Sequence, residues 1–186
     1  MDIEEFTSAR DFRTWLSKNH DGSEGIWLRI FKKVQGKSFT YADGLDEALC
    51  FGWIDGQKKS HDEISWLQKF TPRRSKSGWS KINRDHVARL IRTRKMRAPG
   101  LKAVESAKND GRWDAAYDSP KNATVPEDFL KELKKNGQAH EFFKSLNKAN
   151  IYSITYRLQT AKKPETRTKR MKLILEMLRR GEKFHE

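Results

Sequence analysis

The chain has 186 residues, of which 35% are hydrophobic and 34% charged, and its formal net charge is +14 at pH 7. This length suits one domain, or one compact unit with an appended helical part. No apolar run approaches the ~20 residues that a membrane-spanning helix needs. A single cysteine excludes an internal disulfide. These features exclude a disulfide scaffold and a helical membrane protein.

The amino terminus opens with acidic residues, whereas a secretory signal would open with basic residues and then become apolar. We therefore expect a cytoplasmic protein. The positive charge is larger in residues 94–186 than in residues 1–93. Such a field attracts anionic partners, among them nucleic acid, phosphorylated ligands and anionic lipid. A well-solvated helical surface rich in lysine explains the charge equally well.

The first 52 residues predict a helix, a strand and a second helix. Ser8 has the position of a helix cap, ahead of apolar residues at helical spacing. In residues 25–34, the aliphatic Ile26, Leu28 and Ile30 alternate with Trp27, Arg29 and Phe31. This pattern is typical of a strand with one purely aliphatic face. Thr40 begins a capping box, and the helix after it should end near Gly52.

Residues 52–60 and 63–71 place Trp, Ile and Phe between charged residues and are separated by a polar turn. We interpret them as an antiparallel hairpin that pairs with the first strand. The pattern after residue 79 is helical to the end of the chain. The expected helices begin at Ser80 or Asn83, at Pro99, at a Thr124 capping box and ahead of Ile151 and Met171, with stops at Gly111 and Gly181.

These elements predict an α+β protein. Its first part is a small antiparallel sheet of three to four strands with flanking helices, and its second part is a helical carboxy-terminal region. Residues 112–125 are the best candidate for a boundary. We assign residues 1–115 to the α+β region and residues 116–186 to the helical region, and we expect one compact unit.

Few residues have the spacing of a catalytic or metal site. The five histidines have no partner at metal-ligand spacing, so the sequence predicts neither a metal nor a cofactor. A nucleophile would require Cys50 to meet His61 or His86. Cys50 lies at an apolar helix end, however, where a thiol behaves as a small hydrophobic side chain.

Asp55 is the one weak candidate for a catalytic residue. It is a carboxylate between Ile54 and Gly56 in an aromatic setting, where its proton affinity can be shifted toward acid or base chemistry. The structural alternative is that Asp55 caps a turn or pairs with Arg73 or Arg74.

The loop from Thr71 to Asn83 is the main candidate for a ligand site. Arginines bind phosphate or carboxylate with two parallel hydrogen bonds, and a tryptophan ring stacks on a base. A helix beginning at Ser80 would direct its free N–H groups at the same anion. The structural alternative is that Trp79 fills the junction between sheet and helix. The candidate ligand-binding residues are Arg73, Arg74, Ser77, Trp79, Ser80 and Asn83.

A second basic patch joins the last two expected helices and contains Lys162, Arg167 and Arg170. The two arginines are three residues apart, hence on one helix face, where they could clasp a carboxylate or another anionic ligand. A solvated helix face is the alternative interpretation.

The segment Ala161-Lys-x-Pro-Glu-Thr-Arg-x-x-Arg170, followed by an apolar helix and Gly181, resembles the carboxy-terminal signature of a bacterial family. This is the YdeI/OmpD-associated family (OmdA-like, "bacteriocin-protection"). Residues 47–56 and Phe70-Thr-Pro-Arg-Arg74 are similar to the amino-terminal part of its longer members, so the likeness extends from about Gly25 to Gly181.

The resemblance implies envelope-associated protection against antimicrobial peptides, in a family whose members are often predicted to be periplasmic. It implies no catalytic residue. This chain departs from that picture in two ways: it opens without a signal peptide, and its charge of +14 would repel cationic peptides.

We therefore expect a non-enzymatic basic binding protein of this type, in stress or antimicrobial-peptide protection, that binds an anionic ligand. Two alternatives stay open. One is an enzyme acting on a phosphorylated or carboxylated small molecule, with Asp55 as acid or base and the arginines as a clamp. The other is sequence-tolerant binding of nucleic acid. The sequence does not define the oligomeric state.

Overall fold

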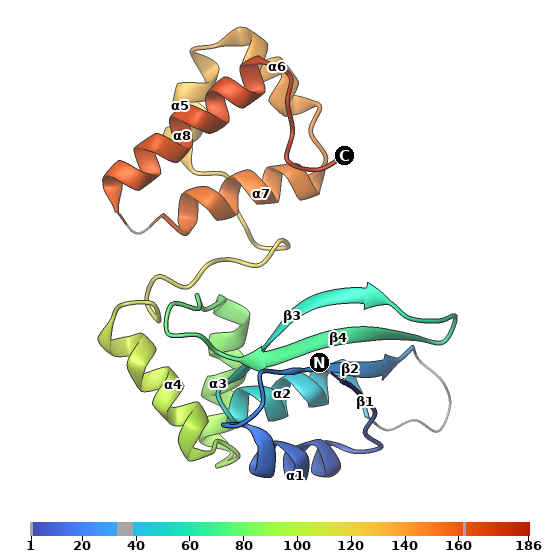
Figure 1. Cartoon of the computed structure of the whole chain (residues 1–186). Coiled ribbons are helices and arrows are strands. Elements are labelled where there is room, and N and C mark those ends of the chain that lie inside the picture. Colours follow the sequence, from blue (N-terminus) through green and yellow to red (C-terminus); the bar gives the residue numbers. More distant parts are fainter. Residues whose placement is uncertain (1, 33–38, 162) are drawn as a thin grey trace. The chain divides into compact units, whose positions relative to one another are not determined.

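The computed structural model describes residues 2–32, 39–161 and 163–186. The chain divides into two compact units (Figure 1). The sheet unit consists of Met1–Ser77 and Asn83–Trp113, and the helical unit consists of Gly78–Ile82 and Asp114–Glu186. Within the described residues, no helix combines the length and the apolar character needed to cross a membrane.

The α+β class is confirmed. Elements of the first part are, in chain order, β1 (Ile3–Glu4), α1 (Ala9–Asn19), β2 (Ile26–Phe31), α2 (Tyr41–Cys50), β3 (Trp53–Ser60), β4 (Ser65–Pro72), α3 (Lys81–Arg92) and α4 (Ala98–Asn109). The second part contains α5 (Glu127–Lys134), α6 (Gly137–Lys144), α7 (Lys148–Gln159) and α8 (Pro164–Arg179).

The four strands have the order β1-β2-β4-β3. The predicted hairpin is confirmed as β3 and β4, and β4 pairs with β2 in antiparallel orientation, also as predicted. Strand β1 was not predicted, because two residues are too few to show an alternating pattern. Because β1 pairs with β2 in parallel, the sheet is mixed and not purely antiparallel.

The aliphatic face of β2 forms the core of the sheet unit. Ile26, Leu28 and Ile30 are each at most 2% exposed, and Figure 1 shows α1 and α2 together on one side of the sheet. The ring of Phe12 in α1 lies 6.0 Å from the ring of Phe70 in β4. Burial of such aliphatic and aromatic surface is the main stabilising term of the unit.

Two of the expected helix caps are confirmed, and a third is wrong. The Ser8 side chain accepts a hydrogen bond from the N–H of Asp11, and Thr40 forms a complete capping box with Asp43. The Thr124 capping box does not form, because α5 begins at Glu127 with no side-chain hydrogen bond at its cap. Helix α6 was missed, since it begins with glycine, which disfavours a helix.

The helical unit has its own apolar core, to which all four of its helices contribute. Phe129, Leu133, Ile154 and Leu178 are each fully buried or nearly so. Glycine at position 181 has a φ of 72°, which ends α8 where the sequence predicted. A core of this kind gives the second unit a separate source of stability.

Candidate functional site

The predicted ligand loop contains both exposed and buried residues. Arg74 is exposed and Arg73 half-buried, whereas Trp79 is 1% exposed and Asn83 8%. A base needs an open ring face on which to stack. Trp79 therefore lies in a position typical of a structural tryptophan, and Arg74 is the exposed cation of this group.

The polar groups of the loop form local hydrogen bonds. The N–H of Arg74 donates to Ser77 Oγ at 3.0 Å, and the N–H of Ser77 donates to the carbonyl of Arg74 at 2.9 Å. Ser80 forms an isolated β-bridge with Tyr117 in the helical unit. Ser77 and Ser80 thus stabilise the local path of the main chain.

Asp55 has a partner that the sequence analysis did not connect with it. The Tyr41 hydroxyl donates to Asp55 Oδ2 at 2.7 Å and so links α2 to β3. Burial, and after it the charge of Asp55, raise the pKa of Tyr41 above its ordinary value. The phenol therefore stays protonated and keeps donating. This bond supports a structural role for Asp55.

Cys50 is fully buried at the end of α2. Burial, and after it the nearby carboxylate of Glu47, raise the pKa of its thiol to about 11, so it stays protonated and unreactive. His86 lies 2.8 Å from a carboxylate oxygen of Asp46. Across the described residues, no group of three or more His, Cys, Asp or Glu side chains is arranged to hold a metal ion.

The arginines of the second basic patch bind to the protein itself. Arg167 forms two hydrogen bonds with Asp128 of α5. Arg170 donates to the main-chain carbonyl of Arg157 in α7 at 2.7 Å. Lys162 lies outside the described residues. The two arginines therefore attach α8 to its neighbours in the helical unit.

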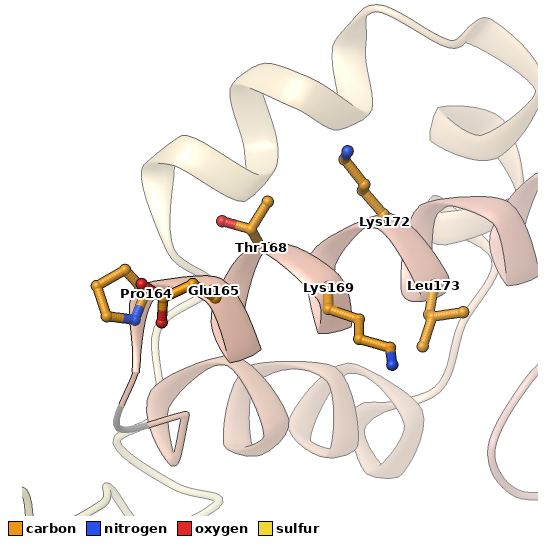
Figure 2. A pocket seen from close by; sticks show the side chains of 6 residues that line it. All are labelled: Pro164, Glu165, Thr168, Lys169, Lys172 and Leu173. Atoms are coloured by element: carbon orange, nitrogen blue, oxygen red, sulfur yellow. The ribbon is translucent and has the colours of Figure 1, made fainter.

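The outer side of α8 carries a different set of residues (Figure 2). Leu173 is 60% exposed there, beside the exposed side chains of Lys169 and Lys172. They border an open depression of about 600 Å³, lined by Pro164, Glu165, Thr168, Lys169, Lys172 and Leu173.

The face of the sheet opposite the aliphatic face is basic and aromatic, which sequence reasoning missed. Trp27 of β2 is paired across the strands with Lys69 of β4. Lysine ammonium groups lie over its indole ring, with Nζ of Lys59 at 4.3 Å and Nζ of Lys69 at 5.8 Å from the ring centroid. Both distances are within the range of cation–π attraction. Three strands thus bring one ring and two cations together.

A further cation–π contact lies along β2, between Arg29 and Phe31. The guanidinium carbon of Arg29 is 4.6 Å from the centroid of the Phe31 ring. Arg29 also forms ion pairs with Asp62 at 2.7 Å and with Glu5 at 3.2 Å. Because two carboxylates neutralise Arg29, this arginine is less available to an anionic ligand.

One signal in the sequence pointed to this face. The alternation in β2 places Trp27, Arg29 and Phe31 on one side, away from the aliphatic residues. The contribution of Lys59 and Lys69 depends on the strand order and register, which the sequence does not reveal.

The sheet unit also has an acidic depression, at the start of β2. It has a volume of about 500 Å³, and its lining includes Asp2, Glu4, Glu24 and Trp15. The positive charge of the chain is therefore unevenly distributed even within this unit.

The fold and the Trp27 face define an α+β protein with a basic, aromatic sheet surface and a separate helical unit. Residues 4–103 match the sequence model of a domain of unknown function (DUF8412), and since this match covers more than half of the chain, the chain belongs to that family. Residues 122–181 match the family described as "Bacteriocin-protection, YdeI or OmpD-Associated", which confirms the predicted resemblance for this segment. No curated protein and no solved structure matches the chain.

Proposed function

We propose that the protein is a non-enzymatic binding protein for single-stranded nucleic acid, with little preference for sequence. The observation that supports this proposal most directly is the Trp27 ring with Lys59 and Lys69 over it. Sequence-tolerant binding of single strands combines an aromatic platform with cations that follow the backbone. Trp27 is half-buried, and a strand would reach its ring by displacing the two ammonium groups.

Binding exchanges one set of contacts for another. In the free protein the lysine ammonium groups lie over the indole ring, where they gain cation–π attraction. A bound strand offers each ammonium a phosphate and offers the ring a base, and stacking contributes about 1–3 kcal/mol per base. A duplex keeps its bases stacked on one another, so it cannot use the ring in this way.

Arg74, the exposed arginine of the predicted loop, is proposed as a further phosphate contact. The net charge of +14 brings the anionic strand to the protein. We place this activity in the bacterial cytoplasm, the location expected from the sequence. Any protective role would then act through an anionic target, because the charge of the chain repels cationic peptides.

The test is fluorescence anisotropy with a labelled single strand of about 12 nucleotides, which fits the site size of such proteins. Trp27→Ala should weaken binding about 5- to 150-fold, the loss expected for one stacked base. Lys59→Gln with Lys69→Gln should reduce the slope of log affinity against log salt by about 1.4, the value for two phosphate contacts on a single strand.

The matched control is Lys131→Gln with Lys134→Gln, which removes the same charge from exposed positions of α5. This variant should change the salt slope less than the sheet variant does. Circular dichroism should show that all variants keep the fold. The proposal fails if Trp27→Ala binds like the unmodified protein, or if a duplex of the same sequence binds as tightly as the single strand.

A further inference from the structure

Residues 182–186 lie against α7 after the chain turns at Gly181. The N–H of Glu182 donates to the carbonyl of Met177 at 3.0 Å, which completes the turn at the end of α8. Phe184 is half-buried in this segment and packs against the core of the helical unit, whereas Lys183 and His185 are exposed. The segment therefore has one apolar anchor, Phe184, between two exposed residues.

Asn150 of α7 uses its side chain to bind the main chain of this segment. It is 1% exposed. Its Oδ1 accepts from the N–H groups of Phe184 and His185, both at 2.9 Å, and its Nδ2 donates to the carbonyl of His185 at 3.1 Å. Nδ2 also donates to Asn147 Oδ1 at 3.0 Å. All four hydrogen-bonding positions of the amide are thus satisfied, three of them by main-chain groups.

Two further residues of the same helix face contact the side chains of the segment. The guanidinium carbon of Arg157 lies 3.9 Å from the centroid of the Phe184 ring. Ser153 Oγ lies 2.7 Å from Nε2 of His185. Arg157 is itself held by a hydrogen bond to the carbonyl of Ser153 at 3.1 Å. Asn150, Ser153 and Arg157 follow one another at helical spacing, so they form one continuous strip.

We propose that this strip of α7 is a peptide-binding site that residues 183–186 occupy in cis. Its ligand in trans is an extended segment of another polypeptide in which an aromatic residue precedes a histidine. The amide of Asn150 recognises main chain of any sequence, Arg157 selects the aromatic ring, and Ser153 contacts the histidine.

Exchange is feasible because each intramolecular hydrogen bond adds little net free energy in water. While the segment is detached, Asn150 lacks three partners, and the main chain of a second peptide replaces them one for one. The segment therefore competes with any peptide for the same groups. The site belongs to the helical unit and does not depend on nucleic-acid binding by the sheet unit.

The experiment measures the binding of a labelled peptide, Gly-Glu-Lys-Phe-His-Glu, by fluorescence polarisation. The full chain is compared with Phe184→Ala, which weakens the cis segment and leaves the strip intact. Because the closed segment reduces the apparent affinity by the fraction of open molecules, Phe184→Ala should bind at least about 10-fold more tightly. His185→Pro, which removes one N–H that Asn150 accepts, is a second variant with the same expectation at an exposed position.

Two controls locate the binding. A peptide with alanine in place of phenylalanine has the same charge and should not bind. Addition of Arg157→Ala to the Phe184→Ala chain should abolish binding, while circular dichroism reports the fold. The proposal is overturned if the peptide binds neither weakened variant, since residues 183–186 are then a fixed part of the fold. It is also overturned if binding is equal in the unmodified chain or survives Arg157→Ala.

Discussion

Replacement of Gly100 by alanine tests how α4 packs against the end of α2. Helix propensity alone predicts that alanine at a helical position stabilises the protein by about 0.5–1 kcal/mol relative to glycine. The structure predicts the opposite sign. A Cβ atom at position 100 would lie 2.3 Å from the carbonyl oxygen of Cys50 and 2.7 Å from that of Leu49. Both atoms are main chain and cannot rotate away, so α4 must move.

The movement has a cost that can be estimated. Overpacking of a well-packed core costs about 1–3 kcal/mol. The movement of α4 also strains the hydrogen bond from the N–H of Arg97 to the carbonyl of Cys50, at 3.1 Å, which attaches the start of α4 to α2. We expect Gly100→Ala to lower the free energy of unfolding by about 1–3 kcal/mol, because the overpacking and the strained hydrogen bond together outweigh the gain in helix propensity.

Urea denaturation followed by tryptophan fluorescence measures this change. Gly137→Ala is the matched control, because it lies at the first position of α6 and a Cβ there meets no atom within 4 Å. That variant should be as stable as the unmodified protein, or more stable by no more than the propensity gain of about 0.5–1 kcal/mol. A Gly100→Ala protein as stable as the unmodified one would refute the close approach of α4 and α2.

Three further predictions concern other parts of the chain. A hydrogen bond from the Ser65 hydroxyl is the main cause that lowers the pKa of Asp62 to about 2. The ionised carboxylate therefore stabilises the fold above the ordinary pKa of 3.8, and this stabilisation is lost as the pH falls toward 2. Asp62→Asn should remove this acid-dependent contribution to the free energy of unfolding, which is measured as a changed pH profile of unfolding. Arg170→Ala should cost about 1–2 kcal/mol, because it removes a part-buried hydrogen bond to a carbonyl of α7. Arg179→Ala removes an exposed pair within α8 and should leave the midpoint of thermal denaturation almost unchanged. Alkylation of Cys50, whose pKa is raised to about 11 by burial, should require unfolding, and mass spectrometry of iodoacetamide-treated protein checks this.

Local patterns predicted most of the secondary structure. Ser8 and Thr40 supply side-chain oxygens that only a helix start can use fully, and the alternation in residues 25–34 has the period of a strand. The failures occurred where the local signal was weak. Thr124 has the spacing of a capping box, yet α5 begins without one. Strand β1 is too short to show a period, and it forms because β2 offers an edge with which it can pair.

The candidate sites depended on relations that no local pattern contains. Trp79 and Arg73 were grouped because they are close in sequence, yet Trp79 is buried. Trp27, Lys59 and Lys69 are far apart in sequence and meet because β4 lies between β2 and β3. Sequence proximity therefore favoured the loop, and strand order revealed the sheet face.

The sequence by itself determined the α+β class, the hairpin, the positions of most helices and the likeness of residues 122–181 to the bacteriocin-protection family. Each follows from side chains within a few turns or one strand length of each other, where propensity, capping and alternation act directly. Tertiary structure alone decided that Tyr41 binds Asp55, that Asn150 holds the segment after α8, and that lysines from two strands cover Trp27. Those contacts join residues at least 14 positions apart, and only the packing of whole elements brings such residues together.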